Sequence, residues 1–189
     1  MMKPLAAAIL ALPLLGACGA PVFRIDAPPA VARGDAARVP VSVGSVEVQD
    51  VSLPLYANQE VIYFETPEGA LASNDNLLWA DDPTRSFTEG LAMTLAQITR
   101  ARAAAEPWPF YERPDARLDV RFARALAQND GTFRITGQYF VAATDIDGRE
   151  AARSFDLSAP YDALTTGSIA AARARVIEAL ARQIAADGL

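Results

Sequence analysis

The sequence has 189 residues, 51% of them hydrophobic and 21% charged, which indicates one folded domain with a core of its own. It contains no histidine and one cysteine, Cys18, so a Ser-His-Asp or Cys-His catalytic arrangement, a His/Cys zinc site and an internal disulfide are excluded within this chain. The formal net charge of −6 argues against nucleic-acid binding, which depends on neutralising phosphates.

Residues 1–17 have the pattern of a secretory signal peptide. A lysine precedes an apolar run over residues 5–15, and that run is shorter than the roughly 20 residues that a membrane span needs. We therefore predict that residues 1–17 are removed and that the mature chain begins at Cys18.

The cleavage region reads Leu15-Gly16-Ala17-Cys18 and resembles the lipobox of bacterial lipoproteins. The resemblance implies that the Cys18 thiol receives a diacylglycerol and that its amine, exposed by cleavage, is acylated, for example with palmitate. Two or more acyl chains anchor a protein stably. Because Gly19 rather than aspartate follows the cysteine, the resemblance also points to the outer membrane. The alternative is an ordinary secretory signal with a chance cysteine.

Residues 18–38 contain three prolines and are predicted to form a tether, with a short edge strand over residues 22–26. The domain proper is predicted over residues 39–189. Its first strand covers residues 39–48, with a bulge at Gly44 where the alternation of valines slips by one residue.

Two further strands are predicted before the first helix. The run over residues 61–66 forms one of them, and a short strand within residues 70–79 is broken by the polar residues 74–76. A helix then begins at Asp81-Asp82-Pro83, an acidic cap followed by proline, and continues to about Ala105. Its apolar face consists of Phe87, Leu91, Thr94, Leu95 and Ile98.

Three alternating segments follow, over residues 117–128, 132–144 and 150–159. The turns between them, Asn129-Asp130-Gly131 and Asp147-Gly148, contain residues that tolerate the backbone of a tight turn, so an antiparallel meander is predicted. A final helix over about residues 164–187 has an apolar stripe, and three arginines are predicted to lie largely off it. The stripe consists of Ile169, Val176, Ile177, Leu180 and Ile184, and the arginines are Arg173, Arg175 and Arg182.

The order of these elements predicts an α+β fold. A single domain would contain a mainly antiparallel or mixed sheet, with two long helices packed on one of its faces. The other face of the sheet would be partly polar and open to water or a partner.

Acidic residues offer little chemistry. Asp145, Asp147 and Glu150 resemble the start of a calcium loop, but a hairpin turn accounts for them better because the later ligands are poor. Asp81 and Asp82 are adjacent at a helix start, where acidic residues usually cap the helix. No catalytic residue, metal site or cofactor is predicted.

Two apolar clusters each contain a tryptophan flanked by proline or acidic turn residues. One is Leu77-Leu78-Trp79, and the other contains Trp108, Phe110 and Tyr111. Either these side chains close the ends of the core, or they form an exposed surface for contact with a partner, where aromatic residues are enriched.

Together with the lipobox, four segments of the chain resemble the family of ABC-type transport auxiliary lipoproteins, which includes PqiC. The resemblance runs from about Phe23 to the C-terminus. Residues 57–59 depart from the Leu-Asp-Arg run common in the family. The four segments are Phe23–Pro28, Val43–Val48, Leu53–Tyr63 and Trp79 with the acidic-proline helix start after it.

The resemblance implies a lipoprotein of the Gram-negative outer membrane that faces the periplasm. Such a protein works with an ABC permease and ATPase and with an MCE-domain protein to move lipids between membranes. It serves as a docking component and not as an enzyme, and it forms a ring-like homo-oligomer. The alternatives are a structural envelope lipoprotein that binds peptidoglycan or an assembly machine and, less favoured, a cell-wall hydrolase using two carboxylates.

Overall fold

The computed structural model describes residues 23–26, 38–145, 148 and 150–189. The predicted signal peptide, the lipobox and Cys18 lie outside the described residues, as do most of the tether and Asp147 of the second predicted turn. The boundaries at residues 17 and 38 therefore stay predictions.

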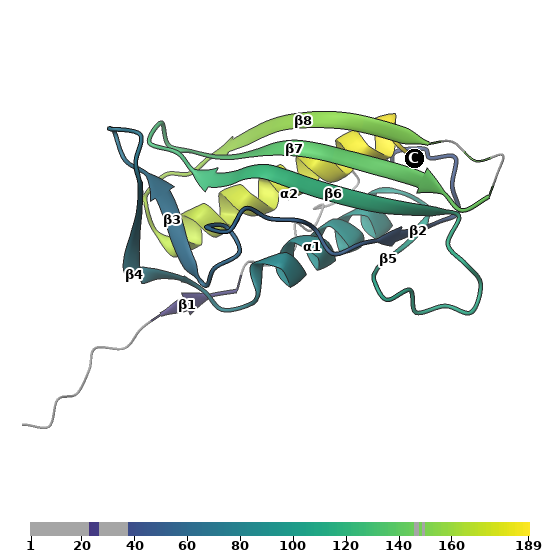
Figure 1. Cartoon of the computed structure of the whole chain (residues 1–189), viewed down its shortest axis with the longest axis horizontal. Helices are drawn as coiled ribbons and strands as arrows, with labels where there is room; N and C mark the ends of the chain where they lie inside the picture. Colours follow the sequence, from purple (N-terminus) through teal and green to yellow (C-terminus); the bar gives the residue numbers. More distant parts are fainter. Residues whose placement is uncertain (1–22, 27–37, 146–147, 149) are drawn as a thin grey trace, which may run out of the picture.

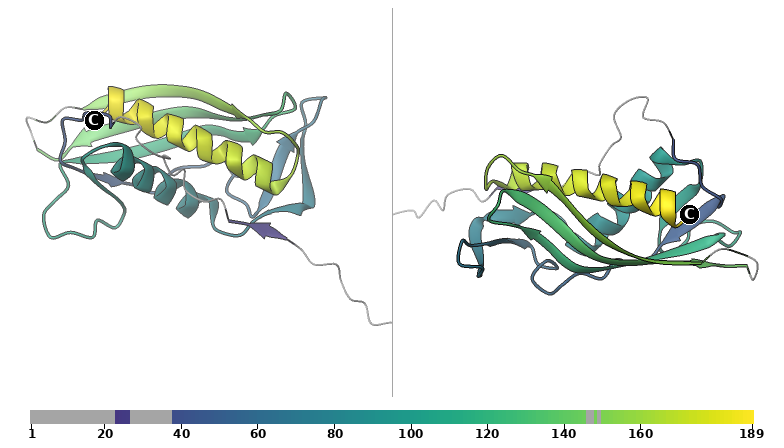
Figure 2. Two further views of the ribbon diagram at one scale, coloured as in Figure 1. Left: turned by 180° about the vertical axis from the view of Figure 1, so that it is seen from behind. Right: turned by 90° about the horizontal axis from the view of Figure 1, so that it is seen from above.

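The described residues form one eight-stranded mixed sheet and two helices, which confirms the predicted α+β class. Both helices lie side by side against the same face of the sheet (Figures 1 and 2). The elements are β1 Arg24–Ile25, β2 Ser45–Val48, β3 Val61–Glu65, β4 Leu71–Trp79, α1 Pro83–Ile98, β5 Arg102–Ala105, β6 Ala116–Ala127, β7 Thr132–Ala143, β8 Ala151–Pro160 and α2 Thr166–Asp187.

Strands β6, β7 and β8 form the predicted antiparallel meander. Gly131 has a φ of +82° in the turn between β6 and β7, a backbone conformation that glycine adopts without strain. Within β7, a side chain at Gly137 would collide with the carbonyl oxygen of Arg121, because the strand passes close to a bulge in β6 between Phe122 and Arg124. Glycine at 137 therefore permits the close approach of the two strands.

The other edge of β6 carries two separate strands. At its start, β6 pairs in parallel with β2, and β2 pairs in parallel with β5. At its end, β6 pairs in parallel with β3, beyond which lie β4 and β1. The sheet therefore divides along β6 into two arms, a feature that no local pattern predicts (Figure 1).

Two predicted strands have different limits in the structure. The strand predicted over residues 39–48 begins only at Ser45, because the backbone before it bonds elsewhere. The Ser42 N–H donates to the carbonyl of Leu189, and the Gly44 N–H donates to the Asp115 carboxylate. By contrast, β4 is unbroken at residues 74–76, and its polar residues instead coincide with a shift in its register with β3.

Helix α1 starts as predicted. Asp82 Oδ1 accepts a hydrogen bond from the Arg85 N–H at 2.8 Å, and Pro83 occupies the first turn. The helix ends at Ile98 and not near Ala105, because Thr99 adopts an extended backbone. The alanine-rich residues after it form β5 along β2, so strand pairing overrides their helix propensity.

Helix α2 buries the five predicted apolar residues, which confirms the stripe. The prediction for one arginine is wrong: Arg173 is only 1% exposed. The helix packs against α1 and against strands from both arms of the sheet, β1 and β4 as well as β7 and β8, so its buried face is wider than the apolar stripe alone. Among the described residues, neither helix is long and apolar enough to cross a membrane.

Candidate functional site

The first predicted aromatic cluster belongs to the core. Leu77, Leu78 and Trp79 are the last three residues of β4, and each is less than a tenth exposed. An exposed contact surface is therefore wrong for this cluster. Trp79 packs at the end of the sheet where β1 and β4 pair, as the alternative interpretation predicted.

The second cluster lies in residues 106–115, between β5 and β6, which we name the aromatic loop. Trp108 is half-buried, Phe110 is 45% exposed, and the Tyr111 side chain is fully exposed. The loop projects from the body of the molecule below β5 in Figure 1. Two of the three predicted contact residues here are therefore accessible to a partner.

Contacts among its own residues, and one from Arg102 in β5, hold the aromatic loop in its shape. The rings of Trp108 and Phe110 meet edge to face with centroids 4.9 Å apart, and the Arg102 guanidinium lies 5.2 Å from the Phe110 ring. Trp108 Nε1 donates to the backbone oxygen of Glu112 at 2.6 Å. Such edge-to-face and cation–π contacts stabilise an exposed loop by roughly 0.5–1 kcal/mol each.

A buried carboxylate ties this loop to the sheet. Glu47, in β2, is 8% exposed, and its Oε1 accepts a hydrogen bond from the Trp108 N–H at 3.0 Å. Its Oε2 accepts from Arg117 Nε at 2.9 Å. Because both oxygens have donors, the burial of this charge is compensated. The exposed rings are consequently presented on a fixed support, which lowers the entropy lost on binding.

Arg173 forms a second unusual arrangement. Its guanidinium carbon lies 4.1 Å from the Phe87 ring centroid and 4.7 Å from that of Trp79. Among the described residues, its Nε and Nη2 have no hydrogen-bond acceptor. Burial lowers the pKa of Arg173 to about 10, since desolvation disfavours the charged form.

The sequence contained a signal for the burial of Arg173. The residue follows Ile169 by four positions and precedes Val176 by three, so it lies on the apolar face of α2. The residue type, by contrast, predicted an exposed side chain, because arginine is almost never fully buried without a partner. Periodicity was the better guide at this position.

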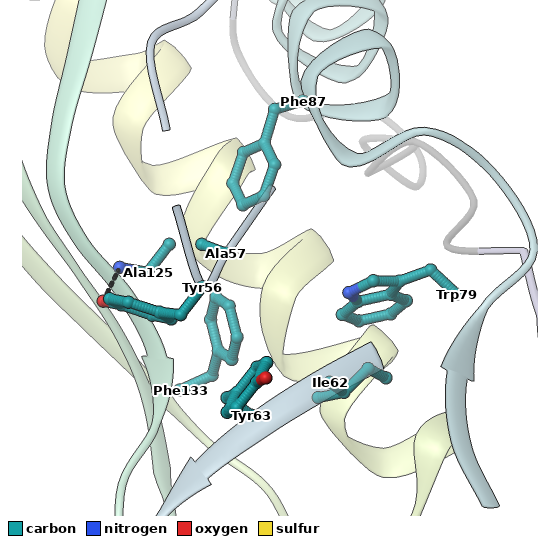
Figure 3. Close-up of a pocket in the computed structure, with 8 residues that line it drawn as sticks. All are labelled: Tyr56, Ala57, Ile62, Tyr63, Trp79, Phe87, Ala125 and Phe133. Atoms are coloured by element: carbon teal, nitrogen blue, oxygen red, sulfur yellow. Dashed lines mark hydrogen bonds between the residues drawn. The ribbon is translucent and has the colours of Figure 1, made fainter. Parts of the chain in front are cut away.

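A small cavity adjoins Trp79 and Phe87 (Figure 3). Its volume is about 20 Å³, enough for a single water molecule and too small for a metabolite or an acyl chain. The Tyr56 hydroxyl beside it accepts a hydrogen bond from the Ala125 N–H at 3.2 Å. The cavity is therefore part of the packed core. Its walls are Tyr56, Ala57, Ile62, Tyr63, Trp79, Phe87, Ala125 and Phe133.

Two of the acidic residues considered for chemistry, Asp81 and Asp82, have structural partners for their carboxylates. Asp82 caps α1, and Asp81 forms an ion pair with Arg85 at 2.5 Å. The backbone carbonyl of Asp145 accepts a hydrogen bond from the Gly148 N–H at 3.0 Å, as in a tight turn. Within the part of the chain that the structure describes, no three histidine, cysteine or acidic residues are grouped as metal ligands. Of the arrangements described above, the aromatic loop is the one best suited to a function, because its exposed rings can bind a partner.

Comparison with known proteins places the fold. The model of a family described as "ABC-type transport auxiliary lipoprotein component" matches residues 23–185. A crystal structure titled "uncharacterized protein" is similar with a TM-score of 0.64 and 18% identity, covering 78% of this chain and 94% of its own. Protein XCC0632 from Xanthomonas campestris has a TM-score of 0.61 and 18% identity, covering 79% and 89% respectively. Among curated proteins, none matches this sequence.

Proposed function

The chain belongs to the family of ABC-type transport auxiliary lipoproteins, and from this premise we propose that it is a non-catalytic docking component of an ABC-driven system that moves lipids between membranes. Its partners would be an MCE-domain protein and the ABC permease and ATPase. The observation that carries this proposal is the aromatic loop, in which exposed Phe110 and Tyr111 stand on a support fixed by buried Glu47. Exposed rigid aromatic side chains are typical anchors of protein interfaces.

Lipidation of Cys18 would place the protein on the outer membrane, facing the periplasm. Five residues separate Cys18 from Arg24, where β1 begins, so the anchor would keep the start of β1 within roughly 22 Å of the membrane. In Figure 1, β1 and the aromatic loop lie toward opposite ends of the molecule. The loop would then be free to meet a protein in the periplasm while the lipid holds the other end.

The sheet also offers an edge for self-association into a ring. Among the described strands, β8 pairs only with β7. A ten-residue strand with one unpaired edge can pair with another chain. We propose that copies of the chain associate through this edge, and sedimentation of the purified lipoprotein would then show an oligomer and not a monomer.

Site-specific photocrosslinking tests the docking role. A photoreactive amino acid at Tyr111, in cells that express the intact lipoprotein, should capture an MCE-domain protein or a permease subunit. The matched control is Leu164, which is 43% exposed and lies outside the aromatic loop. It should capture neither. Absence of both partners from crosslinks at Tyr111 and at Phe110, with the protein folded and membrane-bound, would overturn the proposal.

The lipid anchor has its own test. Cys18→Ser removes the acceptor thiol and leaves every described residue unchanged, so the domain should fold and no longer sediment with membranes. Gly19→Asp keeps the thiol and should leave the protein membrane-bound while moving it toward the inner-membrane fraction. Membrane fractionation of the serine variant identical to that of the native chain would contradict lipidation at Cys18.

A further inference from the structure

A cavity separate from the aromatic loop lies between residues 38–44 and the C-terminal end of α1. Its volume is about 450 Å³, within the range of pockets that bind small molecules. Its lining residues are of two kinds, aliphatic and cationic. They are Arg38, Val39, Pro40, Val41, Val43, Gly44 and Arg100.

Backbone hydrogen bonds hold the wall of this cavity in place. The Val39 N–H donates to the Ile98 carbonyl at 2.7 Å, and the Ser42 N–H donates to the Leu189 carbonyl at 2.8 Å. The Gly44 N–H donates to Asp115 Oδ2 at 2.8 Å. Residues 39–44 are thus fixed to α1, the last residue of the chain and the segment before β6. The cavity therefore exists without a ligand to form it.

Part of the cavity lining is aliphatic. Val39, Val41 and Val43 alternate along the segment, are half-buried and pack against the hydrophobic core. Their remaining exposed surface borders the cavity. Covering it with an alkyl group would be favourable by about 25 cal/mol for each Å² removed from water.

Two further lining residues, Arg38 and Arg100, carry positive charge. Arg38 and Arg100 are exposed, and neither forms an ion pair with a described residue. Eight other arginines of the described chain do form ion pairs. The chain has a net charge of −6, yet the charged residues that line this cavity are both arginines. Asp115, the carboxylate nearest to this segment in the hydrogen-bond pattern, is engaged by Gly44.

The end of α1 explains part of this arrangement. Arg100 follows the last helical residue by two positions, where a cation complements the helix dipole. The helix dipole does not explain the presence of Arg38. It also does not explain why a cavity lies beside the three valines. A ligand with an anionic group next to an alkyl chain satisfies both parts of the lining.

We propose that this cavity binds a phosphate-bearing amphiphile, with the phosphate on Arg38 and Arg100 and the first part of the alkyl chain against the valines. Guanidinium groups are suited to phosphate because their donors match its oxygens. Neither arginine lies in the aromatic loop. An experiment that disproves ligand binding in the cavity would therefore leave the docking role of the aromatic loop untouched, and the reverse also holds.

Binding can be measured on the full chain carrying Cys18→Ser, so that no attached lipid competes. Three probes separate the possible sources of affinity: dihexanoyl phosphatidylglycerol below its micelle concentration, glycerol 3-phosphate and a neutral octyl glucoside. The phosphatidylglycerol should bind with the lowest Kd and should shift the NMR amide signals of Val39, Val41 and Val43. Arg38→Gln combined with Arg100→Gln should weaken it at least tenfold.

The matched control is Arg153→Gln combined with Arg175→Gln. It also removes two exposed arginines that form no ion pair with a described residue, but both lie outside the cavity and the aromatic loop. It should change the Kd by less than twofold. An equal loss of affinity in both double variants would overturn the proposal, because net charge alone would then account for binding. Equal binding of glycerol 3-phosphate would reduce the site to a phosphate site, and equal binding of octyl glucoside would reduce it to an apolar one. Either result contradicts an amphiphile site.

Discussion

Each of the two tryptophans belongs to a cluster of aromatic rings with an arginine over one of them. The cluster of Trp79 is in the core, and that of Trp108 is at the surface. In the core, the Arg173 guanidinium lies over the rings of Trp79 and Phe87. In the aromatic loop, the Arg102 guanidinium lies over Phe110, which itself packs on Trp108. The chemical groups are alike, and the exposure of the cation differs, from 1% for Arg173 to 56% for the side chain of Arg102.

Water determines what each arrangement contributes. The exposed Arg102 keeps its hydration and approaches Glu112 at 3.5 Å, so its charge costs little and its pair contributes little. The buried Arg173 has lost water, and two of its nitrogens find no acceptor among the described residues. The core cluster therefore gains stability from its rings and loses some through its cation, whereas the loop cluster retains exposed rings that only a partner can cover.

Truncating one phenylalanine in each cluster should give the largest difference in stability between the two clusters. Phe87→Ala removes a ring that is 3% exposed and lies 5.0 Å from the Phe122 ring, so the free energy of unfolding should fall by about 3–5 kcal/mol. Phe110→Ala should lower it by less than about 1 kcal/mol. Urea unfolding followed by circular dichroism measures both values, and comparable losses would contradict the assignment of one cluster to the core and the other to the surface.

Replacing the two arginines should give a smaller effect of the opposite sign. Arg173→Met removes a desolvated charge, two of whose nitrogens have no acceptor among the described residues, and fills much of its volume, so the free energy of unfolding should rise by about 1–3 kcal/mol. Arg102→Met should change it by less than about 0.5 kcal/mol. The same unfolding measurement applies. A loss of stability in the Arg173 variant would show that its charge has a stabilising partner and that the contrast with Arg102 is wrong.

A third and smaller effect concerns Asp156, a carboxylate that stays hydrated and also has an ion-pair partner, Arg134. On the outer face of the meander, Arg134 Nε donates to Asp156 Oδ1 at 2.7 Å, and this hydrogen bond lowers the pKa of Asp156. A depressed carboxyl pKa contributes stability above the pKa of the unfolded chain, and that contribution is lost as the pH falls through the folded value.

Arg134→Gln should therefore raise the pKa of Asp156 toward its ordinary value, as measured by NMR titration of the side-chain carboxyl. The stability difference between this variant and the native chain should be present at neutral pH and disappear below the folded pKa. Arg153→Gln, on the same strand as Asp156, is the control and should leave the Asp156 titration unchanged. An unaltered titration in the Arg134 variant would exclude the hydrogen bond as the cause.

Local chemistry was sufficient to predict much of this fold. The meander, the turn at Gly131, the cap at Asp82 and the apolar face of α2 each depend on residues close together in sequence. Their spacing determines which side chains point the same way and where a chain can turn. Predictions based on these signals agree with the structure, and only the ends of the elements moved.

Local chemistry misled where distant segments compete. The alanines after Thr99 favour a helix, yet they pair with β2, which lies more than fifty positions earlier. The valines before Gly44 favour a strand, yet they border a cavity, because the Val39 N–H donates to Ile98 and the Ser42 N–H donates to Leu189. In both cases a hydrogen-bond partner far away in sequence decided the conformation of a segment with a clear preference of its own.

The sequence by itself determined the class of the protein: a lipobox-like N-terminus, an α+β order of elements and a family pattern that the match over residues 23–185 confirms. Only the tertiary structure decided which aromatic cluster meets solvent, which arginine is buried and where two arginines border an aliphatic wall. The physical reason is that burial is a property of the elements that cover a side chain, and those elements come from parts of the chain that no local pattern links.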